Sequence, residues 1–172
     1  MPHPFRLPRR LPLTALAIAA LASALTLPAV AGVAEVRFVD SERFADIGRS
    51  VVERERAMAT LRTHFESLAK QLPEGRTLKV DVLDVDLAGE QRFSRHANDL
   101  RILKGRADWP RIRMHYEVLA EGKALKSGDA DIADMSYLDF SARLPDSGPL
   151  AYERRLLDDW FAKQILSDRA AP

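Results

Sequence analysis

Apolar and polar residues alternate along four segments of the chain, which predicts β-strands with one buried face. The four segments are residues 33–40, 77–87, 111–120 and 123–132. The third is the most regular, because Ile112, Met114, Tyr116 and Val118 share one parity while charged or polar residues occupy the other. In the second, the apolar phase changes near Leu83, which indicates either a β-bulge or burial on both faces.

The last two strands are expected to form a hairpin around Glu121-Gly122, a dipeptide suited to a two-residue turn. Next to the turn, Val118 is expected opposite Leu125. Unbroken pairing would then bury two carboxylates, so we expect one extra residue at Ser127-Gly128, where glycine supplies backbone freedom. The corrected pairs are Met114–Ala130 and Ile112–Ile132 on the inner face, with His115–Asp129 and Arg113–Asp131 on the outer face.

Two further segments show the three- and four-residue spacing of amphipathic helices. The first begins at Ser50, which forms a capping box with Glu53, and ends at Pro73. The second begins near Pro149 and reaches about Ser167. The apolar stripes are Met58, Leu61, Phe65, Leu68 and Leu72 in the first helix and Leu156, Leu157, Trp160, Phe161 and Ile165 in the second.

The predicted order is β-α-β-β-β-α, an α+β fold in which both helices cover one face of a four-stranded mixed sheet. Short joints make the first strand, helix and second strand a parallel βαβ unit. The long basic connection 88–109 is expected to have structure of its own or a function. Within it, residues 98–103 fit a short strand or a helical turn. In the later loop, Tyr137 and Phe140 are expected to be buried.

Residues 1–31 have the layout of a cleavable secretory signal. Three arginines precede an apolar run from Leu11 to Val30, and small residues lead to a cleavage site after Ala31. A membrane anchor is the alternative, because the run is just long enough to span a bilayer. Two prolines bracket the run and shorten any continuous helix, so we expect a periplasmic or secreted protein with no membrane span after cleavage.

The expected mature chain is a single domain, residues 32–172, of 172 − 31 = 141 residues. It has 26 − 3 = 23 basic and 25 acidic residues, a balance that argues against nucleic-acid binding. The chain contains no cysteine. Stability must therefore come from a hydrophobic core without disulfides.

Four blocks of the chain resemble a known family. They are V-R-F-V-D (36–40), D-V-L-D-V-D-L-A-G-E (81–90), G-R-A-D-W-P-R-I (105–112) and Y-E-R-R-L-L-D-D-W-F (152–161). In this order they are similar to small exported proteobacterial proteins of the domain of unknown function 3016 family. The resemblance covers nearly the whole mature chain. It implies an envelope location, and it implies neither a particular activity nor any functional residue.

The basic connection supplies the binding candidates Arg95, His96, Arg101, Arg106 and Trp109. Arginines make bidentate contacts with anionic groups, so the expected partner is an envelope protein or a small anionic ligand. The leading interpretation is a binding or accessory module without enzymatic activity. The alternative is a periplasmic hydrolase that uses His96 or the carboxylates of Asp84, Asp86 and Glu90, although no G-x-S-x-G elbow is present.

Acidic residues at the end of the second strand suggest a second alternative. Asp84, Asp86 and Glu90 carry oxygen ligands of the kind that calcium or magnesium prefers. The competing explanation is a polar strand end that pairs with the basic connection. Another acidic patch, at Asp129 and its neighbours, is better explained by cross-strand ion pairs with His115 and Arg113. No other cofactor is expected, and the oligomeric state is left open.

The signal prediction has a direct test. Intact-mass measurement of the protein recovered from the envelope of its producing cell should give the mass of Gly32–Pro172. A mass that includes the first 31 residues would contradict cleavage. An additional bound mass, or a multiple of the chain mass, would identify a ligand or an oligomer.

Overall fold

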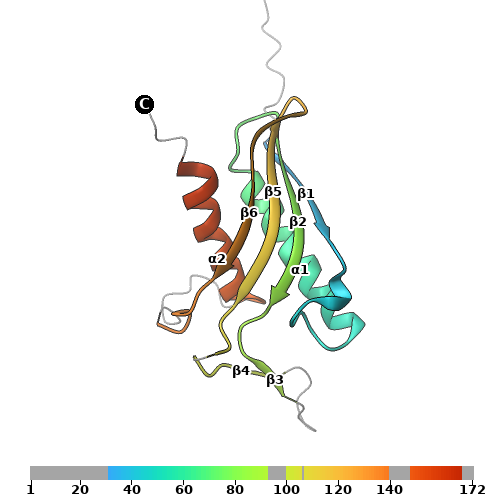
Figure 1. Ribbon diagram of the computed structural model, residues 1–172, viewed down its shortest axis with the longest axis vertical. Coiled ribbons are helices and arrows are strands. Elements are labelled where there is room, and N and C mark those ends of the chain that lie inside the picture. The colour runs from blue at the N-terminus through green and yellow to red at the C-terminus, as the bar shows by residue number, and fades with distance from the viewer. Residues whose placement is uncertain (1–30, 93–99, 106, 140–147, 168–172) are drawn as a thin grey trace, which may run out of the picture.

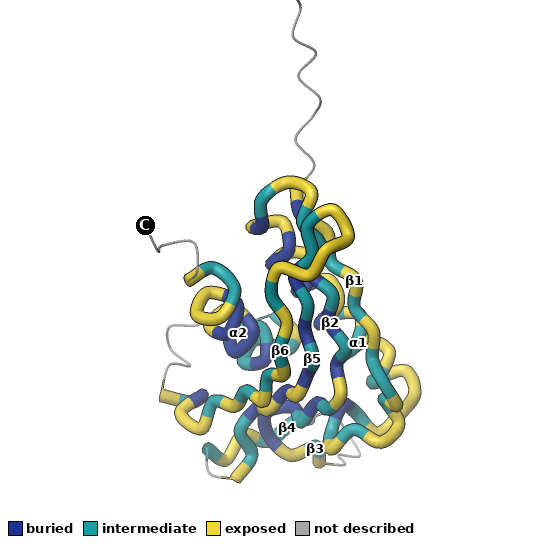
Figure 2. The backbone as a smooth tube through the Cα atoms, turned by 45° about the horizontal axis from the view of Figure 1, so that its top comes forward, coloured by how far each residue is buried: buried dark blue, intermediate teal, exposed yellow. Residues whose placement is uncertain are grey.

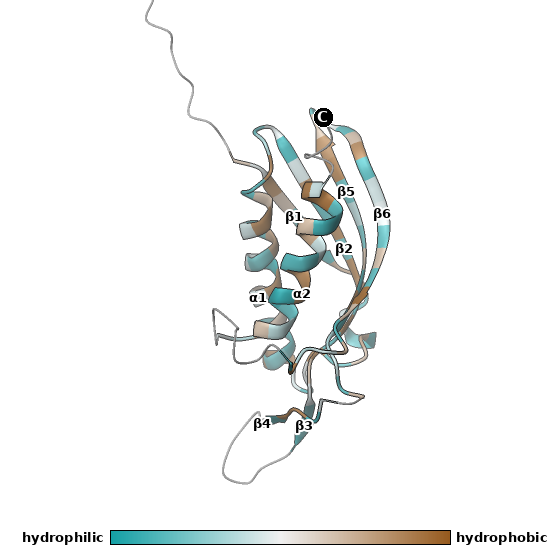
Figure 3. Cartoon of the chain, turned by 90° about the vertical axis from the view of Figure 1, so that its left-hand side faces the viewer, coloured by the Kyte–Doolittle hydropathy of each residue, from teal (hydrophilic) through white to brown (hydrophobic). Residues whose placement is uncertain are grey.

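The computed structural model describes residues 31–92, 100–105, 107–139 and 148–167. A four-stranded sheet forms one layer and two helices form the other, and both helices lie on the same face of the sheet (Figure 3). The strands are β1 (Val33–Phe38), β2 (Arg76–Asp86), β5 (Arg111–Ala120) and β6 (Lys123–Ala133), and the helices are α1 (Val51–Ala69) and α2 (Ala151–Trp160). The predicted α+β class is confirmed.

The sheet has the strand order β1-β2-β5-β6 (Figure 1). β1 and β2 are parallel, and the other neighbours are antiparallel. A second, two-stranded sheet pairs β3 (Glu90–Arg92) with β4 (Leu100–Ile102). Part of the 98–103 segment is therefore a strand. A short 3₁₀ turn (Ser41–Arg43) follows β1, and a π-helical turn (Phe161–Leu166) continues α2.

The start of α1 is the capping box expected from the sequence. The Ser50 hydroxyl accepts a hydrogen bond from the Glu53 backbone N–H at 3.1 Å, and the Glu53 carboxylate accepts one from the Ser50 N–H at 2.9 Å. Reciprocal bonds of this kind satisfy N–H groups that have no partner within the helix. The first turn of α1 is thereby held in place beside the loop that follows β1.

The core lies between the inner face of the sheet and the two helices. Figure 2 shows buried residues along the central strands β2 and β5 and along α2. The stripe residues Leu61, Phe65 and Leu157 have no exposed area. Trp160 of α2 packs edge-on against Tyr116 of β5, with ring centroids 5.2 Å apart. Burial of these apolar side chains is the main stabilising contribution in a chain without disulfides.

The register of the β5–β6 hairpin confirms the four predicted pairs but corrects the position of the bulge. Val118 lies opposite Lys126 and Leu119 opposite Ala124, so the extra residue is Leu125, which is exposed. The predicted bulge at Ser127-Gly128 and the predicted Val118–Leu125 pair are wrong. A bulge anywhere between the turn and residue 128 produces the same distant register, so the alternation pattern does not determine its position.

Gly128 has a different role from the one predicted. It stands opposite Tyr116 in the regular ladder, and no positive φ is found there. A Cβ atom at this position would lie 3.2 Å from the Tyr116 hydroxyl oxygen. Glycine therefore makes space for the tyrosine ring rather than supplying backbone freedom.

The change of apolar phase near Leu83 is a β-bulge. The β2–β5 register shifts between Val82 and Asp84, and Leu83 is exposed. Burial of this segment on both faces is thereby excluded. Because of the bulge, Asp84 lies opposite Arg113 on the outer face while Val85 remains in the core.

The predicted secretory signal lies outside the described residues except for Ala31, so it stays a prediction. Phe140 also lies outside the described residues. Tyr137 is 1% exposed, as expected for a buried loop aromatic. Within the described ranges, neither helix has the length and apolar content needed to cross a membrane.

The hairpin turn yields a stability prediction. Glu121 has φ 49° and Gly122 has φ 76°, the pair of positive values that a two-residue type I′ turn requires. Asparagine tolerates the left-handed region better than glutamate, so Glu121→Asn should raise the free energy of unfolding by about 0.5–1 kcal/mol. Urea denaturation measures this change. Lys123→Asn, one position into β6, should give no such gain, and equal effects of both variants would contradict the explanation.

Candidate functional site

A pocket of about 600 Å³ opens between the first turns of the two helices. Its walls are mainly apolar, and they include Ile47, Ala57, Leu87, Pro149 and Leu150. We call it the helix-start pocket. It lies just beyond the end of β2, because Leu87 follows that strand directly. The region beyond the carboxyl ends of parallel strands is a common position for ligand sites in sheets covered by helices.

Arg101 lines one side of the helix-start pocket and connects several segments around it. From β4, its guanidinium contacts the Asp46 carboxylate at 2.6 Å. It also donates hydrogen bonds to the carbonyl oxygens of residues 87, 88 and 89, at 3.1, 2.9 and 2.9 Å. The planar, five-donor geometry of arginine allows one side chain to hold several acceptors at once. The small β3–β4 sheet is thereby attached to the end of β2.

Glu153 holds α2 against the same chain segment. It lies in the first turn of α2, is 2% exposed, and accepts a hydrogen bond from the Ala88 N–H at 2.7 Å. Burial raises the pKa of the Glu153 carboxyl above its usual value, and the Ala88 N–H and Arg101 act in the opposite direction. The bond supplies an acceptor for an N–H group that water does not reach.

Gln91 and Glu53 form the polar edge of the pocket. The Gln91 side-chain amide donates to one Glu53 carboxylate oxygen at 2.9 Å. The other Glu53 oxygen accepts the backbone N–H groups of Arg49 and Ser50. In the described part of the chain, the buried Gln91 side-chain oxygen has no hydrogen-bond partner.

Three carboxylates lie near one another beyond this edge. Asp46 and Asp86 form an isolated parallel bridge, and Asp84 accepts the Ala45 N–H at 2.8 Å. Partial burial raises the pKa of Asp86, and the negative charges of Asp46 and Asp84 raise it further. Arg101 opposes this shift. The end of β2 is therefore a mixed-charge region.

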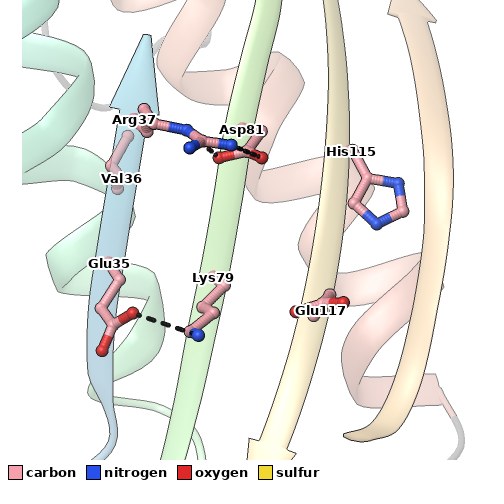
Figure 4. A pocket seen from close by; sticks show the side chains of 7 residues that line it. All are labelled: Glu35, Val36, Arg37, Lys79, Asp81, His115 and Glu117. Atoms are coloured by element: carbon pink, nitrogen blue, oxygen red, sulfur yellow. Dashed lines mark hydrogen bonds and ion pairs between the residues drawn. The ribbon is translucent and has the colours of Figure 1, made fainter. Parts of the chain in front are cut away.

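The outer face of the sheet carries a smaller depression, of about 390 Å³ (Figure 4). Two ion pairs join β1 to β2 across it. The Arg37 guanidinium contacts Asp81 at 2.5 Å, and the Lys79 ammonium lies 3.6 Å from Glu35. Exposed pairs of this kind contribute little to stability. We interpret these side chains as solvent-exposed ion pairs between neighbouring strands.

A family model described as a protein of unknown function (DUF3016) matches residues 32–163. The chain belongs to this family. No curated protein and no solved structure matches the chain. The family assignment confirms the resemblance found in the sequence. The matched range includes every described residue that lines the helix-start pocket.

Of the binding residues expected in this DUF3016 chain, the structure describes Arg101 and Trp109. Arg101 lies at the helix-start pocket. Trp109 is half-buried immediately before β5 and lines none of the pockets described above. Arg95, His96 and Arg106 lie outside the described residues. The hydrolase alternative based on His96 therefore stays a prediction.

Of the expected metal ligands, Asp84 and Asp86 lie near each other at the end of β2, whereas Glu90 has another partner. Glu90 lies on β3 and pairs with Lys104, and that hydrogen bond lowers the pKa of Glu90. Asp84 instead contacts Arg113 at 3.3 Å. Among the described residues, no three histidine, aspartate or glutamate side chains are grouped so as to hold a metal ion.

The second acidic patch is engaged in cross-strand pairs, one of which differs from expectation. The His115 ring contacts Asp129 at 2.7 Å, as predicted. Asp131 pairs with Arg111 at 2.7 Å rather than with Arg113, its register neighbour. Arginine side chains reach diagonally across a sheet, so register alone does not decide the ion pair.

The sequence patterns did not indicate two residues that shape the helix-start pocket. Glu153 occupies a core-facing position of α2, three residues before Leu156 and four before Leu157, and that spacing was an available signal of burial. Leu150 has φ 55°, and nothing in the local sequence indicates this left-handed start of α2. Both positions depend on how α2 docks against the end of β2.

Glu153 yields a prediction about pH dependence. Because burial raises the pKa of this carboxyl, the fold is stabilised when the carboxyl is protonated. This stabilisation is fully present below the unfolded pKa of about 4.3 and is lost as pH rises through the pKa of the folded state. Glu153→Gln keeps an acceptor for the Ala88 N–H and removes this loss. Urea denaturation should therefore show it at least as stable as the wild type near pH 7, with the advantage shrinking toward pH 4.

Glu153→Ala is the matched control. It leaves the buried Ala88 N–H without an acceptor, which should lower the free energy of unfolding by about 1–3 kcal/mol. Equal losses for the glutamine and alanine variants near pH 7 would contradict the proposed role of the carboxyl.

Proposed function

We propose that this DUF3016 protein is an envelope ligand-binding module, whose helix-start pocket takes a small molecule with an apolar body and an anionic group. The observation that carries the proposal is the pocket itself, with its apolar walls and the 88–109 connection at its edge through Gln91 and Arg101. A volume of about 600 Å³ is within the range of small-molecule sites in proteins.

The charges around the pocket favour an anionic group. Arg56 lines the pocket, is exposed, and has no ion pair among the described residues. The acidic lining residue, Glu53, already uses both carboxylate oxygens in hydrogen bonds. The Arg101 guanidinium is compensated by Asp46. The uncompensated charge that faces a ligand is therefore that of Arg56.

Hydrogen bonds connect the segments that frame the pocket. Arg101 joins β4 to the end of β2, and Glu153 joins α2 to the same segment. These bonds fix β4 and the start of α2 against the end of β2, and all three segments border the opening. A preformed site loses less conformational entropy when it binds a ligand. The expected secretory signal supports an envelope location.

An anionic apolar dye tests the proposal. Anilinonaphthalene sulfonate should bind the wild-type chain at one site with a saturable rise in fluorescence. Ala59 is exposed and lines the pocket, so Ala59→Trp fills the opening without altering the core and should weaken binding about tenfold or more. Arg56→Gln should weaken it several-fold, because it removes the charge and leaves the apolar walls.

Thr63→Trp is the matched control, since Thr63 is exposed on α1 and does not line the pocket. It should leave dye binding unchanged. Thermal melts of the variants establish that each is folded. Absence of saturable dye binding to the wild type, or equal binding by the Ala59→Trp and Thr63→Trp variants, would overturn the proposal.

A further inference from the structure

β1 is an edge strand of the four-stranded sheet. Within the described ranges, it pairs with β2 alone, in parallel register. Just after β1, the Val39 N–H donates to the Val82 carbonyl of β2 at 2.9 Å. In a parallel ladder, alternate residues direct both backbone groups toward the same neighbour, so the odd-numbered residues of β1 face β2. The N–H and C=O groups of Ala34, Val36 and Phe38 therefore face away from the sheet, where another strand can satisfy them.

The inner face of β1 is less completely buried than that of the strand beside it. Val36 and Phe38 are half-buried, whereas Val80 and Val82, their neighbours in the register, are 1% and 0% exposed. A strand added beside β1 would cover these apolar side chains further. β1 also lacks features that commonly block pairing at an edge, because it contains no proline and its register with β2 shows no bulge.

Charged side chains on the outer face form two rows that cross the sheet and begin at β1 (Figure 4). Register neighbours from β1 to β5 make up the first row: Glu35, Lys79 and Glu117. Register neighbours from β1 to β6 make up the second row: Arg37, Asp81, His115 and Asp129. Acidic and basic side chains alternate along each row. The two rows therefore reach the edge of the sheet with opposite charges.

Backbone geometry limits how a second copy of the chain can pair with this edge. In antiparallel pairing about a two-fold axis, outward-facing residues pair with outward-facing residues, so the axis passes beside a residue rather than between two. An axis at Glu35 or Arg37 opposes that residue to its own copy, and directly opposed like charges destabilise strand pairing. An axis at Val36 opposes Glu35 of each copy to Arg37 of the other. Axes nearer the ends of β1 pair fewer residues.

We propose that two copies of the chain form a dimer by antiparallel pairing of their β1 strands about Val36. The two sheets then continue into each other through backbone hydrogen bonds. On the inner face, Phe38 lies opposite Ala34 of the other copy. On the outer face, the first charge row of one copy joins the second row of the other at two Glu35–Arg37 contacts. The alternation of acidic and basic side chains continues across the interface.

The pattern of β1 favours a second copy over an unrelated strand. A two-fold interface requires a strand that is complementary to itself when read in the opposite direction. Glu35 and Arg37 meet this requirement, because they stand at equal distances on either side of Val36 and have opposite charges. Within each copy, Lys79 and Asp81 already pair with these two side chains. In the dimer, each of the two lies between two opposite charges, so no like charges are brought together.

Sedimentation velocity over a range of protein concentrations tests the proposal with two charge variants. The wild-type protein should show a reversible monomer–dimer equilibrium. Glu35→Lys gives each β1 strand two positive charges, and Arg37→Glu gives it two negative charges. Each variant alone should dimerise about tenfold more weakly or less, because like charges then oppose each other at both contacts. The two side chains are 62% and 72% exposed, so both variants should remain folded, which thermal melts establish.

An equimolar mixture of the two variants is the decisive measurement. In the mixed dimer, both contacts again join opposite charges, so mixing should restore dimerisation. Glu121→Lys and Lys123→Glu are the matched controls, since they change the net charge by the same amounts at the exposed hairpin turn. Each control alone should dimerise like the wild type.

Three results would each overturn the proposal. They are a wild-type protein that stays monomeric at every concentration, a dimer that neither β1 variant weakens, and a mixture that does not regain dimerisation. The dye titration of the helix-start pocket is independent of these outcomes, because no β1 residue lines that pocket.

Discussion

The apolar stripes of the two helices have one sheet face on which to be buried, and the rest of the structure follows from this constraint. Leu61 and Phe65 of α1 and Leu157 of α2 are fully buried against the inner positions of β2 and β5. Without cysteines, no covalent link supplements this core. Both helices lie on one face of the sheet (Figure 3), and the opposite face remains charged.

The ends of the elements are held by polar bonds rather than by the core. Arg101 donates hydrogen bonds to three carbonyl oxygens and to the Asp46 carboxylate, and Glu153 accepts one from the Ala88 N–H. Each bond satisfies a group that the packing of the helices removes from water. These bonds join β4 and the start of α2 to the end of β2, and apolar side chains beside them line the helix-start pocket.

Much of the fold was predictable, and much less of the candidate site. The alternation of β5, the Ser50–Glu53 capping box and the helix stripes depend on neighbouring residues and were correctly predicted. Arg101 was recognised as a binding candidate, but Ile47 and Leu150 were not. Their importance depends on contacts between segments distant along the chain. The position of the β6 bulge was wrong because Leu125 and Ser127-Gly128 satisfy the same alternation.

The sequence by itself determined which faces are apolar, the order of the main strands and helices, and that the sheet is mixed. These properties follow from periodicity, capping and turn chemistry, which act over a few residues. The tertiary structure alone decided that Glu153 is buried, that Asp131 pairs with Arg111, and that the edge strand β6 lies beside α2. The physical reason is that burial and electrostatic partners are set by side chains from other elements, which only the packed molecule brings together.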